Sequence, residues 1–114
     1  AFVERDRRAQ QLIAENLAHC GLTSGCVIIR ASVARAIDDL THAHDSFDLI
    51  LLDPPYDETA DGVVDSAGAL LAPRGVLVLE HARRQPSPES AGRLARTRQL
   101  VTGDSALSFY SCLP

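Results

Sequence analysis

The residues best suited to chemistry in this sequence follow a short apolar run. Residues 49–52 are all apolar, and Asp53-Pro54-Pro55-Tyr56 comes directly after them. An uninterrupted apolar run predicts a strand covered on both faces, so Asp53 should emerge at the strand's carboxyl end, where open α/β sheets place their sites. Two consecutive prolines remove two N–H donors and fix φ, so the loop cannot continue the strand pairing or begin an ordinary helix. Its carbonyl oxygens therefore stay free to accept hydrogen bonds.

This combination suits methylation of an exocyclic amino group on a nucleobase. The lone pair of such an amine is delocalised into the ring, which makes it a poor nucleophile. Hydrogen bonds from the NH2 group to the Asp53 carboxylate and the Pro54 carbonyl would draw the nitrogen towards tetrahedral geometry and aim its lone pair at an electrophilic methyl group. Tyr56 offers a flat face for a base taken out of its helix. The competing interpretation is a strand that ends in a proline-rich turn with no chemistry.

The elements around this motif alternate between strands and helices. Apolar spacing predicts strands at residues 2–4, 27–30, 47–53 and 76–79. Helices should begin at the capping residues Asp6 and Ser32, and a further helix should contain Val63, Val64, Ala67, Leu70 and Leu71. Two last strands, at about 94–101 and 106–112, flank Gly103-Asp104 and should form an antiparallel hairpin. The fold class is therefore α/β, a three-layer and mostly parallel sheet that ends in an antiparallel hairpin.

Length and composition describe an ordinary globular chain. With 114 residues, we expect a single domain over residues 1–114. No apolar segment is long enough to cross a bilayer, and the charged start of the chain lacks a signal-peptide pattern, so we expect a cytoplasmic protein with no membrane partner. The cysteines Cys20, Cys26 and Cys112 form an odd set without a CxxC pair. This favours reduced thiols, and neither cysteine nor histidine spacing predicts a metal site.

The charge pattern is unusual for a nucleic-acid enzyme. The formal net charge is −4, whereas phosphate binding normally shows as a basic surface. All 11 basic residues are arginine, and eight of them lie in local groups at 5–8, 83–84 and 93–98. Arginine suits bidentate phosphate contacts, although charge clusters are more often solvated surface. Each group is a candidate RNA contact.

Four segments stand in a specific order along the chain. They are Phe2-Val3-Glu4-Arg5-Asp6, Leu52-Asp53-Pro54-Pro55-Tyr56, Leu79-Glu80-His81 and Gly103-Asp104-Ser105-Ala106-Leu107-Ser108-Phe109-Tyr110. In this order they resemble the RsmD-type 16S ribosomal RNA guanine-N2 methyltransferases, a branch of the Rossmann-like S-adenosylmethionine-dependent methyltransferases. The resemblance covers essentially all 114 residues. It implies S-adenosylmethionine as cofactor and ribosomal RNA or the small-subunit ribosomal particle as partner. We expect a monomer.

The resemblance also implies roles for residues at the strand ends. In such enzymes the acid that ends the second strand holds the cofactor ribose, a role that maps onto Glu4. The residues after the third strand flank the adenine, which maps onto Ser32 and Val33. Asp53 contacts both cofactor and target, and the catalytic motif is Asp53, Pro54, Pro55 and Tyr56. The family often has Asp or Asn where Ser32 stands, so the usual contact with the adenine amino group differs here.

The start of the sequence departs from the family. Before the position of Glu4 the family has a first strand and a glycine-rich turn that cradles the cofactor, and before those an RNA-contacting segment. This sequence has none of them and contains no Met. We therefore expect a fold that is incomplete at its N-terminus, lacking the middle strand between the strands of Glu4 and Asp53.

Three functions stay open on sequence grounds. The first is methylation of a guanine N2 in small-subunit ribosomal RNA. The second is adenine-N6 methylation of DNA, which shares the Asp-Pro-Pro-Tyr motif, although the strand of Glu4 before the motif favours the RNA family. The third is a non-catalytic remnant without a complete cofactor site. His81, at a strand end, is either a general base or a hydrogen-bonded structural histidine, and we favour the structural role.

Overall fold

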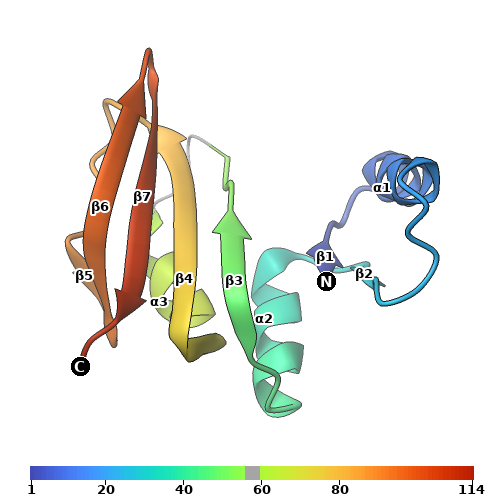
Figure 1. The fold of residues 1–114 in the computed structure, drawn as a ribbon, viewed down its shortest axis with the longest axis horizontal. Coiled ribbons are helices and arrows are strands. Elements are labelled where there is room, and N and C mark those ends of the chain that lie inside the picture. The colour runs from blue at the N-terminus through green and yellow to red at the C-terminus, as the bar shows by residue number, and fades with distance from the viewer. Residues whose placement is uncertain (56–59) are drawn as a thin grey trace. The chain divides into compact units, whose positions relative to one another are not determined.

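The computed structural model describes residues 1–55 and 60–114, which form two compact units, Ala1–Leu40 and Thr41–Pro114 (Figure 1). The elements in chain order are β1 (Phe2–Val3), α1 (Arg7–His19), β2 (Ile28–Ile29), α2 (Val33–His42), β3 (Phe47–Leu52), α3 (Ala60–Gly68), β4 (Leu71–Ala82), β5 (Ser90–Ala91), β6 (Leu94–Thr102) and β7 (Ser105–Cys112). The strands form one sheet of two strands and one sheet of five. None of the helices in the described ranges is long and apolar enough to span a membrane.

The first unit contains a small parallel sheet and capped helices. β1 pairs with β2, placing Val3 opposite Ile29. The predicted cap at Asp6 is confirmed, because its carboxylate accepts a hydrogen bond from the Ala9 backbone N–H at 2.9 Å. α1 is followed by Gly21 at φ 74°, a conformation that glycine adopts without strain.

The second unit is a five-stranded sheet in the order β3-β4-β7-β6-β5. β3 and β4 run parallel, with Leu52 opposite Leu79. β7 pairs antiparallel with both β4 and β6, and the turn between Thr102 and Ser105 contains Gly103 at φ 59°. The predicted hairpin is confirmed, and its tip lies at the same edge of the sheet as the carboxyl ends of β3 and β4 (Figure 1).

The predicted third helix is too long at its C-terminal end. α3 ends at Gly68, and Leu71 already belongs to β4. Pairing passes from Phe47 opposite Leu71 to Leu49 opposite Val76, so the residues around Pro73 bulge out of the ladder, where a missing N–H is tolerated. A Cβ at Gly75 would lie 2.9 Å from the Asp48 carbonyl oxygen, so only glycine fits this close approach. Pairing with β3 thus overrides the helical spacing of the local sequence.

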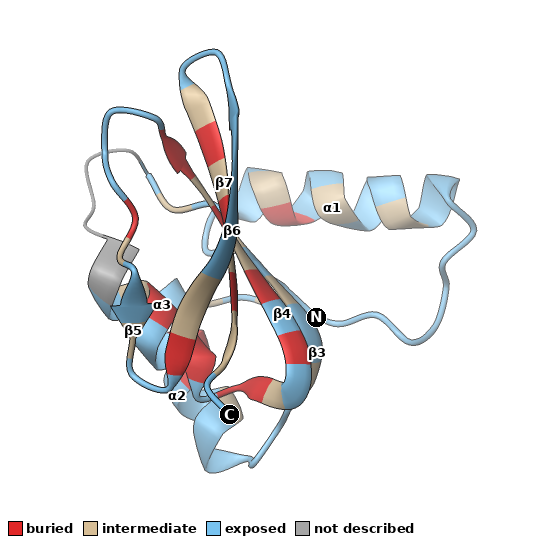
Figure 2. Ribbon diagram, turned by 60° about the vertical axis from the view of Figure 1, so that its left-hand side comes forward, coloured by how far each residue is buried: buried red, intermediate tan, exposed pale blue. Residues whose placement is uncertain are grey.

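The core lies on one face of the larger sheet. The fully buried side chains Leu77, Leu79 and Tyr110 come from β4 and β7, and the buried residues Val64 and Ala67 come from α3 (Figure 2). Register places the three strand residues on the same face, since Leu77 lies opposite Tyr110 and alternation keeps Leu79 on that side. This packing anchors β4, the strand next to the Asp53 motif.

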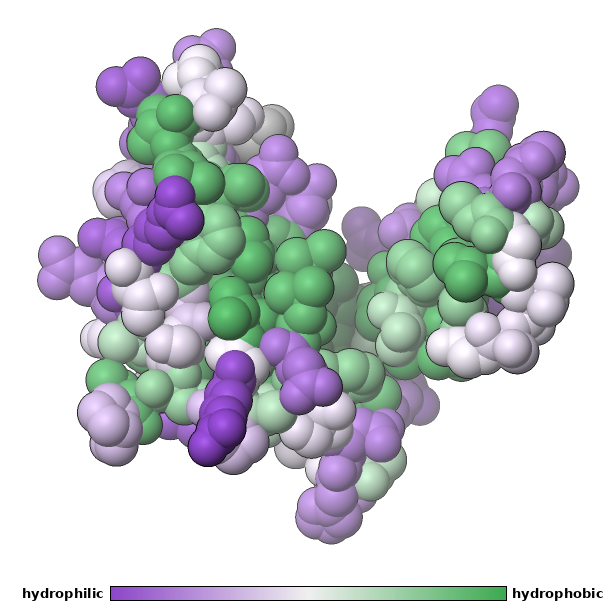
Figure 3. Space-filling model, viewed as in Figure 1, coloured by the Kyte–Doolittle hydropathy of each residue, from purple (hydrophilic) through white to green (hydrophobic). Residues whose placement is uncertain are grey.

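The opposite face of the same sheet is apolar and open. Leu49 and Leu51 are 58% and 70% exposed, and Val76 lies opposite Leu49 on the same face. Figure 3 shows apolar side chains gathered over β3, β4 and β7 on this side. The prediction that residues 49–52 are covered on both faces is therefore wrong for the described chain. Among the described strands β3 pairs only with β4, so its other edge has no partner strand within the described residues.

Candidate active site

The Asp53 motif follows the carboxyl end of β3. Asp53 and Pro55 are exposed and Pro54 is half-buried. Among residues 1–55 and 60–114, the Asp53 carboxylate has neither a hydrogen-bond partner nor an ion-pair partner. Within these ranges its oxygens are therefore available to accept hydrogen bonds from a ligand. Tyr56, the predicted base-stacking residue, lies outside the described residues.

The end of the neighbouring strand β4 is organised differently. Glu80 is half-buried, and His81 is 6% exposed. The His81 Nδ1 atom lies 2.9 Å from the Ala82 carbonyl oxygen and 2.8 Å from that of Gln85, and its Nε2 atom lies 2.8 Å from the Ser108 hydroxyl. Both ring nitrogens are thus occupied by protein partners. The structural role that we favoured for His81 agrees with this geometry, and a general-base role does not.

Glu4 lies at a strand end in the first unit, as Asp53 does in the second. It follows β1, is half-buried, and its backbone N–H donates to the Ile29 carbonyl at 3.0 Å. Its carboxylate accepts a hydrogen bond from the Asp6 N–H at 3.3 Å, and its carbonyl accepts one from the Gln10 side chain at 2.7 Å. Backbone and carboxylate are both held in place, as a hydroxyl-binding acid at a strand end requires.

Ser32 and Val33 follow the parallel strand β2. The Ser32 hydroxyl accepts a hydrogen bond from the Arg35 N–H at 3.2 Å, which confirms the predicted helix cap. Val33 is 45% exposed, so its methyl groups are available for an apolar contact. Because β1 and β2 are parallel, Glu4 and these two residues leave the two-stranded sheet at the same edge.

The structure therefore brings the predicted site residues together in two sets. Glu4, Ser32 and Val33 share one edge of the smaller sheet, and Asp53, Pro54 and Pro55 lie at the carboxyl edge of the larger one. Within the described part of the chain, no group of three or more His, Cys, Asp or Glu side chains is arranged to hold a metal ion. The chemistry available in both sets is hydrogen bonding by carboxylates and carbonyls.

Comparison with known proteins places the chain in a family. A family model described as "Conserved hypothetical protein 95" matches residues 1–111. The chain belongs to this family, the RsmD family.

Individual relatives agree with the family assignment. The chain is 32% identical over 112 residues to "Putative rRNA methyltransferase YlbH" of Bacillus subtilis, covering 96% of this chain and 61% of the relative. It spans about three fifths of that relative's length. A solved structure titled "conserved hypothetical protein" from Streptococcus pyogenes superposes with a TM-score of 0.85 at 30% identity, over 95% of this chain and 68% of that one.

A more distant structure supports the fold alone. "Crystal structure of SMU.776, a putative methyltransferase complexed with SAH" matches with a TM-score of 0.76 at 12% identity, over 95% of this chain and 37% of that one. The predicted fold class, a Rossmann-like α/β methyltransferase fold that is partial relative to its neighbours, is confirmed. The sheet is not mostly parallel over the described strands, because β3 and β4 are the parallel pair of the five-stranded sheet and its other three pairs are antiparallel. β1 and β3 lie in separate sheets.

Sequence reasoning missed several polar residues near the predicted site of this RsmD-family chain. Ser87, Ser108 and Gln10 are 6%, 0% and 7% exposed, and each forms hydrogen bonds that fix a strand end or the loop after it. Serine and glutamine are common surface residues, so their types carry no burial signal. Ser108 could have been found by strand alternation, because it shares a face of the predicted strand with the apolar residues Ala106 and Tyr110.

Proposed function

We propose that this protein is an S-adenosylmethionine-dependent methyltransferase that modifies the exocyclic N2 amino group of a guanine in small-subunit ribosomal RNA. The observation that carries the proposal is the Asp53-Pro54-Pro55 segment at the carboxyl end of β3, with an exposed carboxylate that has no partner among the described residues. Membership of the RsmD family and similarity to "Putative rRNA methyltransferase YlbH" support ribosomal RNA as the class of substrate.

Asp53 and Pro54 would activate the amine by orienting it. The Asp53 carboxylate accepts one N–H of the target NH2 group and the Pro54 carbonyl accepts the other. The nitrogen lone pair then turns out of the plane of the base and points at the methyl group, which lowers the barrier by positioning and electrostatics. Asp53 does not have to remove a proton before methyl transfer, because the amine becomes strongly acidic only afterwards. Tyr56 would stack on the base.

The residues of the first unit fit the cofactor. Glu4 presents a half-buried carboxylate, held by the Asp6 N–H, that can accept hydrogen bonds from two ribose hydroxyls. Val33 presents an exposed apolar side chain suited to one face of an adenine. Ser32 uses its hydroxyl as a helix cap, so it contributes position more than a hydrogen bond to the adenine. When bound, S-adenosylmethionine supplies a methyl group made electrophilic by its sulfonium.

Substitution of Asp53 tests this mechanism in the complete protein. Asp53→Ala should slow single-turnover methylation at saturating cofactor by on the order of a hundredfold or more, by analogy with loss of one preorganised hydrogen-bonding group. Cofactor affinity should stay within a few-fold. Asp53→Asn should retain part of the rate, because the amide oxygen still accepts one hydrogen bond.

Asp48→Ala is the matched control, since Asp48 is an exposed carboxylate at the amino end of the same strand. Its rate should equal that of the wild type. Nucleoside analysis of the product would identify the base, with N2-methylguanosine in small-subunit RNA as the expected result. N6-methyladenine in DNA would favour the alternative enzyme, and a near-normal rate for Asp53→Ala would remove the proposed role of the motif.

A further inference from the structure

The end of β4 contains a buried chain of hydrogen bonds next to the proposed active site. His81, Ser87 and Ser108 are all more than nine-tenths buried, and they come from β4, the following loop and β7. Ser87 and Ser108 hydroxyl oxygens lie 2.7 Å apart, and the Gln99 side-chain amide donates to Ser108 at 3.2 Å. Buried polar groups of this kind are maintained only when their partners are satisfied, and they fix one arrangement when they are.

The partners of His81 determine which group donates and which accepts in each of these hydrogen bonds. Both neighbours of Nδ1 are carbonyl oxygens, which only accept, so Nδ1 carries the proton. In the neutral ring Nε2 then accepts the Ser108 hydroxyl proton. Ser108 in turn accepts from the Ser87 hydroxyl, and Ser87 accepts from Arg96 Nη1 at 3.0 Å. All of these hydrogen bonds therefore have the same donor-to-acceptor direction. The first donor is Arg96 and the last acceptor is the Gln85 carbonyl oxygen.

The same contacts fix the loop of residues 83–88 on the end of the sheet. The Arg83 N–H donates to the Asp104 carbonyl at the hairpin tip, at 2.7 Å. Arg96 also donates to the Ser87 carbonyl at 3.0 Å, and the Tyr110 hydroxyl donates to the Pro88 carbonyl at 2.6 Å. Pro86 and Pro88 further restrict the backbone. The loop is therefore ordered before any ligand binds.

Two guanidinium groups are carried by this ordered loop. Arg83 and Arg84 are exposed, and within the described ranges neither side chain has an ion-pair partner. β3 and β4 are parallel, with Leu52 opposite Leu79, so Asp53 and the loop leave the sheet at the same edge. β4 continues past the level of Asp53 to Ala82, which places the arginines roughly 10 Å beyond that level at about 3.3 Å per residue.

We infer that residues 83–88 form a preorganised phosphate-binding loop, in which Arg83 and Arg84 contact the RNA backbone beside the target nucleotide and His81 is a positioning residue. The inference rests on the proposed RNA substrate. Arginine forms bidentate contacts with phosphate, and an ordered loop loses less conformational entropy when it binds. In a chain of net charge −4, such a localised contact supplies the attraction to RNA that the overall charge does not.

The Arg83→Gln/Arg84→Gln double variant of the complete protein tests the phosphate contact. Filter binding to small-subunit ribosomal RNA should show at least a roughly tenfold loss of affinity. The slope of log affinity against log salt should become shallower by about 1.4, at about 0.7 for each lost contact with single-stranded RNA. KM for RNA should rise, while kcat and S-adenosylmethionine affinity stay unchanged.

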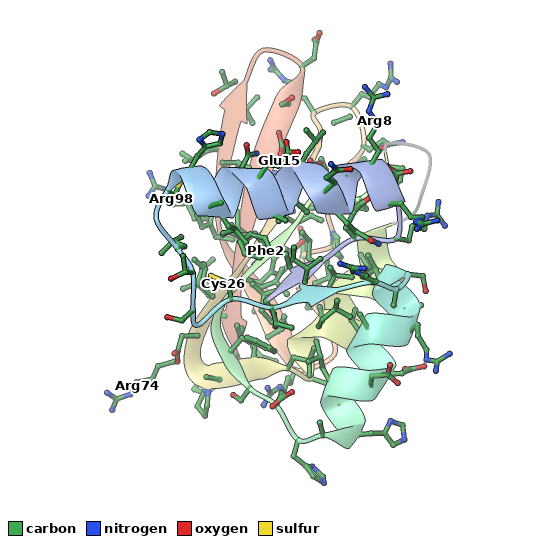
Figure 4. All side chains as sticks on the ribbon, turned by 90° about the vertical axis from the view of Figure 1, so that its right-hand side faces the viewer. Phe2, Arg8, Glu15, Cys26, Arg74 and Arg98 are labelled. Atoms are coloured by element: carbon green, nitrogen blue, oxygen red, sulfur yellow. The ribbon has the colours of Figure 1, made fainter. Side chains whose placement is uncertain are left out.

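Arg74→Gln is the matched control, because Arg74 is an exposed arginine at the amino end of β4 and extends away from the sheet at the edge opposite the hairpin tip (Figure 4). It should leave affinity and salt slope unchanged. If the double variant behaves like Arg74→Gln, the phosphate-binding loop is wrong. Wild-type protein that binds this RNA without methylating it would overturn the proposed function, while the binding comparison would still decide the role of the loop.

Two substitutions test the positioning role of His81. His81→Ala should raise KM for RNA several-fold with kcat unchanged, and His81→Asn, whose amide N–H can replace the Nδ1 donor to Gln85, should recover most of the affinity. Circular dichroism would verify that both variants are folded. A large fall in kcat for His81→Ala at saturating RNA would make His81 a catalytic residue instead, and wild-type RNA affinity in a folded His81→Ala would remove the positioning role.

Discussion

The two units of the chain are stabilised in different ways. Ala36 and Ile37 are the buried apolar residues among the described ones in Ala1–Leu40, whereas Thr41–Pro114 has a continuous core of strand and helix residues (Figure 2). The first unit depends largely on caps and local hydrogen bonds, such as those of Asp6, Gln10 and Ser32. The proposed amine-orienting residues therefore sit on a packed sheet, and the proposed cofactor residues sit on elements with little core of their own.

This difference matters for the proposed reaction. An acceptor that orients an amine has to be held within a fraction of an ångström, which a packed strand next to a buried polar chain can provide. Binding of a cofactor can itself order the elements that surround it, so less packing is needed beforehand. Substitutions in the second unit should therefore change stability and methylation rate. Substitutions of the proposed cofactor residues in the first unit should change cofactor affinity.

The largest expected effect is on the core of the second unit. Leu79→Ala should lower the free energy of unfolding by about 2–5 kcal/mol, because Leu79 is fully buried and its removal leaves a cavity. The matched change Leu12→Ala on α1 should stay within about 0.5 kcal/mol, since Leu12 is 52% exposed. Urea unfolding of the complete protein would measure both. Equal losses would contradict the contrast between the units.

The next effect concerns cofactor affinity. Glu4→Gln should weaken S-adenosylmethionine binding by roughly 1–3 kcal/mol, because an amide replaces only part of a charge-assisted pair of hydrogen bonds. Calorimetric titration would measure the affinity, and the single-turnover rate at saturating cofactor should stay near that of the wild type. Glu15→Gln is the control, since Glu15 is an exposed acid on α1 that accepts from Gln11. Unchanged affinity for Glu4→Gln would assign Glu4 to the solvated surface.

A smaller effect is expected at the start of α1. Asp6→Ala removes the cap that accepts from the Ala9 N–H and should lower stability by about 1 kcal/mol. Asp6→Asn retains a capping oxygen and should lose much less. Thermal unfolding followed by circular dichroism would compare the two variants. A loss for Asp6→Ala as large as that for Leu79→Ala would mean that the first unit is cooperative with the core of the second.

The smallest effect belongs to the ion pair on α2. Arg35 and Asp39 are four residues apart with 3.4 Å between nitrogen and oxygen, and their side chains are 73% and 63% exposed. A double-mutant cycle should give a coupling energy of about 0.3–0.5 kcal/mol, and the coupling should disappear near 1 M salt. A coupling that survives high salt would show that this pair is shielded from water in the complete protein.

Much of the fold was predictable because local signals and tertiary structure agree. The β3 strand, the caps at Asp6 and Ser32 and the final hairpin were all read from apolar spacing and capping residues. The end of α3 was not, because Leu71 has helical spacing while its pairing opposite Phe47 depends on a distant strand. Sequence patterns report local preference. They predict the wrong secondary structure where pairing with a distant strand determines it.

The candidate site also contains features that could be predicted from the sequence and features that could not. The strand-end positions of Glu4 and Asp53 were predictable because the end of an apolar strand is a local pattern. The series of hydrogen bonds from Arg96 to His81 was not predictable. It joins residues up to 27 positions apart through serine hydroxyls that have no distinctive sequence context. Only the three-dimensional register of β4 and β7 brings these groups together.

The open edge of β3 has a practical consequence. Its unpaired backbone groups run beside two exposed leucines, Leu49 and Leu51, and such edges recruit further strands from other molecules. For residues 41–114 taken alone, solubility rather than melting temperature should therefore limit yield. Light scattering at increasing concentration would then be the informative assay, and a charged residue in place of Leu51 should delay the onset of self-association.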